Sequence, residues 1–385
     1  MRILQIAPYF PPYLGGQERY VYYLSRELVR KGHEVTVVTA NYPQGAEREE
    51  LDGIQIYRHR CLARPLRNPI APGMLQAGKL AKQFDLIHAH NEHSSAANIA
   101  AWIKHRCKCP LVITSHGELV FGSKSADLIR NLYWNTLGKM TLRSADRITV
   151  ATPSEKNRLV DQLKLNPDAI DLLPVGIDLE YWDSQVTANS DAFKRANQLS
   201  NRKILLVATQ LIKRKGVGYL LEAMPAIIQA HPDALLAIAG SGDEEQNLHQ
   251  QTVTLGLTHH TRFLGQLNDQ QLAQAYQSAD LFILPSLSEG QPTCVMEAWA
   301  FSRPVVATRI TGVVDYFDKT AMLAEPKDPA SLAESIITLL NNPELAQNLG
   351  VSGRNLVESR FRWNQLIDQA ITTYRSVLAS NPGNS

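Results

Sequence analysis

Two glutamates, Glu289 and Glu297, lie in the second half of the chain with seven residues between them. Glu289 falls in a turn after an apolar run, and Glu297 falls about a turn and a half into the helix expected to begin at Pro292. Because a helix advances about 5.4 Å per turn, the two carboxylates are predicted to stand roughly 8–12 Å apart. This separation is too long for a shared proton or a single metal ion. It suits the two ends of one elongated, hydroxyl-rich ligand, since a carboxylate accepts several hydrogen bonds.

The backbone between these glutamates is predicted to bind phosphate. Pro292 fits the first turn of a helix, where its missing N–H leaves no hydrogen bond unmade. The N–H groups of Gly290, Gln291 and Thr293 point into that helix N-terminus, which favours an anion. The expected ligand therefore carries hydroxyls, a diphosphate and further hydroxyls in sequence, which is the form of a sugar nucleotide. Taken alone, either glutamate is better interpreted as an ordinary solvated residue.

A cluster of positive charge follows an earlier predicted strand. Lys213, Arg214 and Lys215 stand at a strand-to-helix junction, where they form a cationic clamp suited to a diphosphate, strengthened by the dipole of the next helix. Gln210 opens the same loop and contributes only a neutral amide there.

Alternating strands and helices must position these residues. The apolar runs at 281–284 and 305–308, joined by a helix at 292–301, predict a strand–helix–strand unit with its ligand site at the carboxyl end of the first strand. Comparable runs predict further strands in the second half at residues 204–209, 234–239, 262–265 and 321–324. In the first half, strands are predicted at residues 2–8, 34–40, 54–60, 86–90, 111–116, 147–152 and 170–176. The fold class is therefore α/β, with two Rossmann-like, doubly wound parallel-sheet domains.

The first half has weaker candidates of its own. Gly15 and Gly16 lie between a predicted strand and a predicted helix at 17–31, where backbone N–H groups can approach a phosphate, although such a pair is also typical of a tight turn. His116 and His90 fall at carboxyl ends of predicted strands, where ligands bind in such sheets. We predict a functional role for His116, and a role in structure or in the shape of the acceptor site for His90 and Glu118.

Composition limits the class of protein. With 385 residues, 44% hydrophobic and 20% charged, the chain suits two globular domains. Its net charge of +2 argues against a nucleic-acid partner, and the first 180 residues are mildly basic, with 23 Lys and Arg against 18 Asp and Glu. The four cysteines make no disulfide framework or zinc site. Neither a signal peptide nor a membrane-spanning run is visible, so a cytoplasmic protein with at most peripheral membrane contact is expected.

The segment from Ser288 to Ala298, continued by residues 304–306, resembles the E-x7-E motif of family 4 of the retaining glycosyltransferases, which have the GT-B fold. The resemblance implies that Glu289 binds the donor sugar and that Glu297 binds the nucleotide ribose. It also implies two sheet domains that face a central cleft.

Other segments extend this resemblance over almost the whole chain. Residues 15–35, GGQERYVYYLSRELVRKGHEV, are similar to the amino-terminal glycine loop and first helix of the family. His116 stands in the place of a donor-contacting histidine, and Lys215 in that of the lysine of a G-R-L-x-x-x-K-G motif. Gln210 departs from that motif, which has arginine there. Trp363 resembles the aromatic residue at which the terminal helix returns to the first domain.

The resulting prediction is a metal-independent retaining glycosyltransferase. The predicted domains are an acceptor domain at 1–180, a linker at 181–201, a donor domain at 202–360 and a returning helix at 361–385. The donor is expected to be a UDP- or GDP-type nucleotide sugar and the acceptor a sugar or a lipid-linked molecule. Glu289, His116 and Lys215 are the expected catalytic residues. The alternatives are a nucleotide-sugar epimerase of the same fold, or a nucleotide-sugar-binding protein with little or no turnover.

Overall fold

The computed structural model describes residues 1–13, 15–117, 124–186 and 190–380. The chain divides into two compact units. Unit 1 comprises Met1–Gly176 with Trp363–Ser385, and unit 2 comprises Ile177–Arg362. The predicted boundaries at residues 180 and 360 lie close to these two crossing points.

Unit 1 is built on an eight-stranded sheet with the order β3-β4-β2-β1-β5-β6-β7-β8. The strands are β1 Arg2–Ile6, β2 Glu34–Asn41, β3 Arg48–Leu51, β4 Ile54–Arg60, β5 Leu86–His90, β6 Leu111–Ser115, β7 Arg147–Val150 and β8 Ile170–Leu172. Neighbouring strands run parallel, except that β3 pairs antiparallel with β4 at the sheet edge. Strand β3 is the one that the sequence did not predict, because its four residues are all exposed and carry no apolar pattern.

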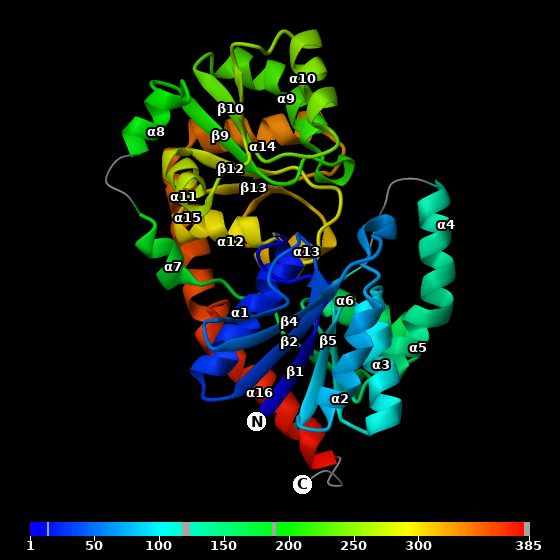
Figure 1. Ribbon diagram of the computed structural model, residues 1–385. Helices are drawn as coiled ribbons and strands as arrows, with labels where there is room; N and C mark the ends of the chain where they lie inside the picture. Colours follow the sequence, from blue (N-terminus) through cyan, green and yellow to red (C-terminus); the bar gives the residue numbers. More distant parts are fainter. Residues whose placement is uncertain (14, 118–123, 187–189, 381–385) are drawn as a thin grey trace. The chain divides into compact units, whose positions relative to one another are not determined.

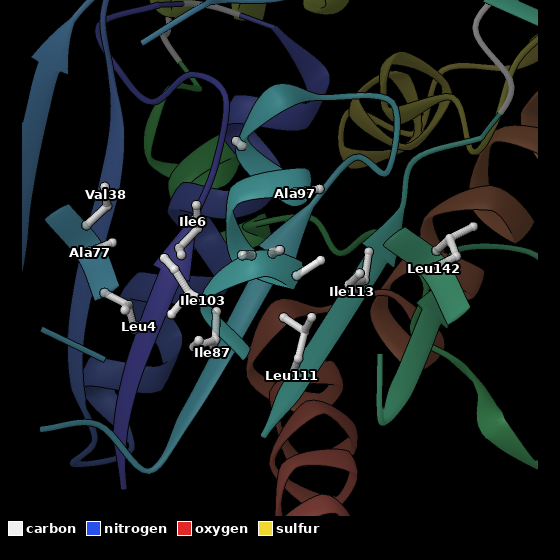
Figure 2. Close-up of a cluster of buried hydrophobic side chains, with 14 of the residues drawn as sticks. Leu4, Ile6, Val38, Ala77, Ile87, Ala97, Ile103, Leu111, Ile113 and Leu142 are labelled. Atoms are coloured by element: carbon white, nitrogen blue, oxygen red, sulfur yellow. The ribbon is translucent and has the colours of Figure 1, made fainter. Parts of the chain in front are cut away.

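Helices cover both faces of this sheet (Figure 1). The helical segments of unit 1 include α1 Gly16–Arg30, α2 Ala77–Ala81, α3 Ser95–Cys107, α4 Lys124–Tyr133, the π-helical turn η3 Trp134–Gly138, α5 Lys139–Arg143, α6 Pro153–Leu163 and α16 Trp363–Ser380. Figure 2 shows part of the core under α3, where Leu4, Ile6 and Ile87 from the strands meet Ala97 and Ile103 from the helix. Strands buried on both faces explain the continuous apolar runs of the sequence.

The opposite face of the same sheet is covered by α1 and by the last helix of the chain. Trp363, Ile367 and Tyr374 of α16 share a buried cluster with Ile3 of β1 and Leu24 of α1. The apolar face of α16 is therefore buried within unit 1, on elements from the start of the chain.

Unit 2 has a six-stranded parallel sheet with the order β11-β10-β9-β12-β13-β14. Its strands are β9 Lys203–Ala208, β10 Ala234–Ala239, β11 Thr261–Gly265, β12 Leu281–Leu284, β13 Val305–Thr308 and β14 Met322–Ala324. Its longer helices are α9 Val217–Ala230, α10 Glu245–Thr254, α11 Asp269–Ser278, α12 Thr293–Ala300, α14 Pro329–Asn341 and α15 Pro343–Arg360, with the shorter α13 Thr311–Phe317.

The linker predicted at 181–201 needs correction, because much of it is helical and packed. Helix α7 spans Leu179–Ser184 and helix α8 spans Ser190–Ala196. Trp182 of α7 is buried, with its ring centroid 6.1 Å from that of Tyr276. Both helices are short, and residues 178–201 as a whole are rich in Asn, Asp, Ser and Gln, which is a composition typical of a loop.

The strand order changes direction at one point in each sheet. In unit 1 the chain leaves β1 towards β2 and later returns to pair β5 on its other side, and in unit 2 the same happens around β9, between β10 and β12. In open α/β sheets, ligands bind outside the carboxyl ends of the strands at such a point. Among the described helices, none is both long enough and apolar enough to cross a bilayer.

Candidate functional site

The loop after β12 is held in one conformation by its neighbours. Strand β12 is entirely buried, and Thr308 at the end of β13 places its Oγ1 within hydrogen-bond distance of the Leu284 and Ser286 carbonyls. Gly312 packs so closely under the loop that a Cβ there would lie 1.6 Å from the Gly290 carbonyl oxygen. A side chain at Gly312 would therefore push Glu289 and its neighbours outward.

Glu289 is a buried carboxylate held by two cations. Lys215 Nζ donates to Glu289 Oε1 at 2.5 Å, and Arg214 Nη1 lies 3.3 Å from Oε2. Ser286 Oγ also donates to Oε1, at 2.7 Å. Burial acts to raise the pKa of Glu289, but the charges and hydrogen bonds of these partners outweigh it and lower the pKa below its ordinary value. The side chain is 8% exposed and stays ionised at neutral pH.

The loop after β9 brings the two cations to this position. Lys213–Lys215 form one turn of 3₁₀-helix, which ends at Gly216 with φ +66°. A Cβ on Gly216 would lie 2.0 Å from the Pro285 carbonyl oxygen, so the two loops touch backbone to backbone. Leu287 N donates to the Arg214 carbonyl at 2.7 Å, and Arg214 Nη1 donates to the Ser288 carbonyl at 2.8 Å. The loops after β9 and β12 therefore pack together as one surface at the point where the strand order reverses.

Not every predicted residue of the β9 loop joins this cluster. Lys215 and Arg214 turn towards Glu289, whereas the side chains of Lys213 and Gln210 are exposed. The backbone next to Gln210 is held by the loop after β10, because Leu211 N donates to the Ser241 carbonyl at 2.9 Å.

Glu297 lies on α12, and one of its partners is a neutral hydroxyl. It is 9% exposed, and the Tyr276 hydroxyl donates to its Oε2 at 2.9 Å. The helix begins at Thr293 with Pro292 as its N-cap residue, one position later than predicted. Gly290 is exposed beside this helix start, while Gln291 is buried and its Nε2 lies 3.5 Å from the Met296 sulfur. The side chain of Gln291 therefore packs against α12.

Sequence reasoning missed Tyr276 and Ser286. Tyr276 is fully buried on α11, 21 residues before Glu297, and nothing in a single sequence links the two. Ser286 stands three residues before Glu289, and a turn hydroxyl at that spacing is a recognisable partner for a carboxylate.

In unit 1, Gly15 and Gly16 stand at the start of α1, after β1. A Cβ on Gly16 would meet no atom within 4 Å, so packing does not require glycine there and the space beside its backbone is open. Gly15 differs, because a Cβ there would lie 2.2 Å from Glu18 Oε2. Glu18 is buried, and burial raises its pKa to about 7, with only a backbone hydrogen bond acting in the opposite direction.

The buried Glu18 predicts a pH-dependent gain in stability from Glu18→Gln. An ionised carboxylate is costlier in the fold than in the unfolded chain, so wild-type stability falls as pH rises from about 4.5 to about 7. The variant lacks this fall and should be more stable by on the order of 3 kcal/mol at about pH 8, with little gain at about pH 5. Thermal unfolding at both pH values measures the difference. Glu34→Gln, which changes an exposed carboxylate of the same unit, is the control, and an equal gain at both pH values would contradict the assignment.

His116 lies at the end of β6 among aromatic rings. Its ring centroid is 5.1 Å from Tyr20 and 5.7 Å from His90, and burial lowers its pKa to about 3. A neutral imidazole donates or accepts hydrogen bonds but supplies no positive charge. His90 is fully buried with Nε2 2.6 Å from Gln5 Oε1, which fits the structural role expected for it. Glu118 lies outside the described residues.

Comparisons with known proteins agree with this arrangement. A family model described as "Glycosyltransferase Family 4" matches residues 14–181, and one described as "Glycosyl transferases group 1" matches residues 189–356. An uncharacterized glycosyltransferase of Methanocaldococcus jannaschii is 27% identical over 97% of this chain and 98% of its own length. A phosphatidyl-myo-inositol mannosyltransferase of Mycobacterium tuberculosis is 28% identical over 99% of this chain and 98% of its own.

Solved structures share the fold over the same length. Sucrose-phosphate synthase from Thermosynechococcus elongatus aligns with a TM-score of 0.81 at 24% identity, covering 99% of this chain and all of its own. HepE of Anabaena, crystallised with UDP and glucose, aligns with a TM-score of 0.78 at 21% identity over 98% of this chain and 100% of its own. At these identities the likeness concerns the fold alone.

Proposed function

The chain belongs to the family 4 glycosyltransferases of the GT-B fold, and we propose that it is a retaining enzyme that moves a sugar from a nucleoside diphosphate to an acceptor hydroxyl. One observation carries the proposal. Glu289 is a buried, ionised carboxylate fixed by Lys215 and Arg214 where the strand order of unit 2 reverses. A carboxylate with a fixed orientation suits recognition of sugar hydroxyls, and the cations beside it suit a diphosphate.

In this proposal the donor lies along the loop after β12. Glu297 accepts hydrogen bonds from the ribose hydroxyls, and the backbone N–H groups at Gly290, Gln291 and Thr293 face the diphosphate at the start of α12. Glu289 holds the hydroxyls of the transferred sugar. A lysine has three donors, so Lys215 can keep its bond to Glu289 and still bind phosphate.

Retention of configuration is proposed to occur on one face of the sugar. Both oxygens of Glu289 already have partners, which suits an orienting group better than a nucleophile. The acceptor oxygen forms its bond to the anomeric carbon as the bond to the leaving phosphate breaks, and the acceptor proton passes to a phosphate oxygen. His116, neutral because its pKa is low, is proposed to hydrogen-bond the donor sugar rather than to supply charge.

The charge of the leaving diphosphate is proposed to be met by Lys215, Arg214 and backbone N–H groups, without a metal ion. We therefore expect EDTA to leave the transfer rate unchanged within about twofold, since each cation placed by the protein supplies transition-state stabilisation of its own. The rate is measured with and without added magnesium or manganese after chelation. Loss of transfer that either ion restores would contradict the proposal.

The acceptor is proposed to be a sugar or a lipid-linked molecule, and the donor a UDP or GDP sugar. HepE was crystallised with UDP and with UDP-glucose, so uracil is the first nucleobase to test. Relatives named as mannosyltransferases of phosphatidyl-myo-inositol make a lipid-linked acceptor the first class to test.

A thermal-shift panel of nucleotide sugars tests the donor. A ligand at a hundred times its Kd adds about 2.7 kcal/mol to the stability of the native state, so the correct nucleotide should raise Tm. Donor consumption is then followed with and without acceptor extract. Transfer that requires acceptor supports the proposal, whereas conversion to a second nucleotide sugar without acceptor would indicate an epimerase. Binding without either reaction would indicate a binding protein.

Gln210→Arg tests whether the missing family arginine has been replaced. Arg214 uses one nitrogen on Ser288 and Glu289, which leaves the rest of its planar guanidinium for phosphate oxygens. We expect Gln210→Arg to change kcat by less than about threefold, and Arg214→Ala to lower it about thirtyfold. Lys213→Ala is the companion variant, because Lys213 is the cation of this loop whose side chain is exposed, whereas the other two cations bind Glu289. A gain of about tenfold from Gln210→Arg would indicate a weakened clamp instead.

A further inference from the structure

Five large aliphatic side chains are exposed along one helical segment of unit 1. They are Leu128 (69% exposed), Ile129 (57%), Leu132 (67%), Leu137 (45%) and Met140 (62%), and we call them the apolar stripe. The segment runs through α4, the turn η3 and α5, without a break in the chain. Single exposed apolar residues are ordinary, but a contiguous set on one element marks an interaction site.

The π-helical turn aligns the two halves of the stripe. At about 100° per residue, an uninterrupted α-helix would place Leu137 about 180° and Met140 about 120° around the axis from Leu128. The π-helical turn η3 contains one residue more than an α-helical turn. The residues after it are therefore rotated back by about 100° around the helix axis, compared with an uninterrupted α-helix. Leu137 and Met140 then lie about 80° and 20° from Leu128, and all five side chains fall within an arc of about 100°. The turn thus makes a single apolar face from a sequence that would otherwise spread over half the helix surface.

The opposite side of the segment is anchored to unit 1. The Tyr133 hydroxyl donates to Asn98 Oδ1 of α3 at 2.7 Å, and the Trp134 ring lies 5.1 Å from that of His93. Leu142 of α5 is fully buried in the core under α3 (Figure 2). The stripe therefore has a fixed outward orientation and does not need the segment to unwind.

Positive charge accompanies the apolar stripe. Arg143 of α5 is exposed, and so are Arg106 and Lys108 at the end of α3, whereas Lys104 of α3 is paired with Asp146 at 2.7 Å. On α3, which contacts α5, Trp102 is 44% exposed and carries the Arg106 guanidinium 5.0 Å from its ring. An aliphatic face beside basic residues and an interfacial tryptophan is typical of helices that lie in the plane of a membrane surface.

We infer that this segment docks unit 1 onto an anionic lipid bilayer, with the apolar stripe in the headgroup and acyl boundary and with Arg106, Lys108 and Arg143 near the lipid charges. A bilayer fits better than a second copy of the chain for a reason of size. Stable protein interfaces use about 20–30 residues on each side, several times more than the stripe offers. The inference goes beyond the proposed reaction, because it concerns the surface on which the enzyme works and requires neither donor nor acceptor.

Co-sedimentation with vesicles tests the inference on the full chain. Vesicles of phosphatidylcholine mixed with phosphatidylglycerol should bind the wild-type protein, and those of phosphatidylcholine alone should bind it more weakly. Added salt should weaken the binding to the mixed vesicles. The variant Leu128→Gln with Leu132→Gln should lower the partition coefficient about a hundredfold, since each leucine in the boundary is worth about tenfold. Both side chains are exposed and glutamine favours helix, so the thermal midpoint should match that of the wild type.

A matched pair in unit 2 provides the control. Val253 (69% exposed) and Val351 (46%) are aliphatic residues on helices α10 and α15, and Val253→Gln with Val351→Gln should leave vesicle binding unchanged. Failure of the wild type to bind the mixed vesicles would overturn the inference, as would equal loss in both double variants. A dimer in light scattering that only the leucine variant dissociates, without vesicle binding, would assign the stripe to a second copy instead.

Discussion

Lys215→Ala should lower the transfer rate about thirty- to a thousandfold, because each charge-assisted bond to a developing phosphate contributes roughly 2–4 kcal/mol to the transition state. Lys215 holds two roles in our proposal. Its Nζ fixes Glu289 Oε1 at 2.5 Å, and its remaining donors face the diphosphate. The variant therefore loses both the phosphate contact and the partner that keeps Glu289 ionised.

A pH signature distinguishes this double role from a simple loss of charge. In the wild type, the pKa of Glu289 is lower in the folded protein than in the unfolded chain, so its ionised form stabilises the fold. This stability is present at pH values above the ordinary carboxyl pKa and is lost as pH falls through the lower pKa of the folded state. Without Lys215, burial should dominate and raise this pKa, so the stability deficit of the variant should grow as pH rises through the carboxyl range. Thermal unfolding against pH measures this deficit, and single-turnover transfer at neutral pH measures the chemical step.

Lys319→Ala is the matched control, since Lys319 is an exposed lysine just after α13 in the same unit. It should change neither quantity. A Lys215→Ala enzyme that keeps its rate within about threefold would mean that the diphosphate charge is met elsewhere.

The sequence predicts the two loops that carry the candidate site because their positions follow from local rules. Apolar runs identify β9 and β12, and a turn with glycine before a helix start identifies the place where a phosphate can bind. The neighbourhood of Lys215 and Glu289 then follows from strand order, because parallel strands end at the same edge of the sheet. The orientation of the side chains required the structure. Arg214 turns inward to Ser288 while Lys213 stays exposed, whereas the sequence favoured Arg214 but kept Lys213 as an alternative.

Other features depend on contacts that have no local pattern. Tyr276 reaches Glu297 from another helix, and the buried Glu18 shows its raised pKa only once α1 is packed. The π-helical turn η3 is equally hidden, because residues 134–138 have no composition that separates them from an ordinary helix. Strand β3 is not predicted because all four of its residues are exposed at a sheet edge, so it lacks the apolar pattern of a buried strand.

The two glutamates should fail in different ways when each is replaced by glutamine. Glu289→Gln keeps the size of the side chain but removes its charge, so Lys215 and Arg214 lose their fixed partner beside the sugar. We expect transfer to fall about a hundredfold or more, with the Kd for free nucleoside diphosphate nearly unchanged. Glu297→Gln should act on the nucleotide instead, raising that Kd about ten- to a hundredfold, since a hydrogen bond to a charged group is worth roughly 1.5–3 kcal/mol.

Calorimetric titration with the nucleoside diphosphate and single-turnover transfer at saturating donor separate the two effects. Glu325→Gln is the control, because that carboxylate is 58% exposed and pairs with Arg309 on the surface, where an ion pair contributes little. Tyr276→Phe removes the hydroxyl that donates to Glu297, so it should weaken nucleotide binding in the same direction as Glu297→Gln but by a smaller factor. If Glu289→Gln and Glu297→Gln weakened nucleotide binding equally, the division of the donor between them would be wrong. If Tyr276→Phe altered transfer without altering nucleotide affinity, Glu297 would have to be assigned to the sugar rather than to the ribose.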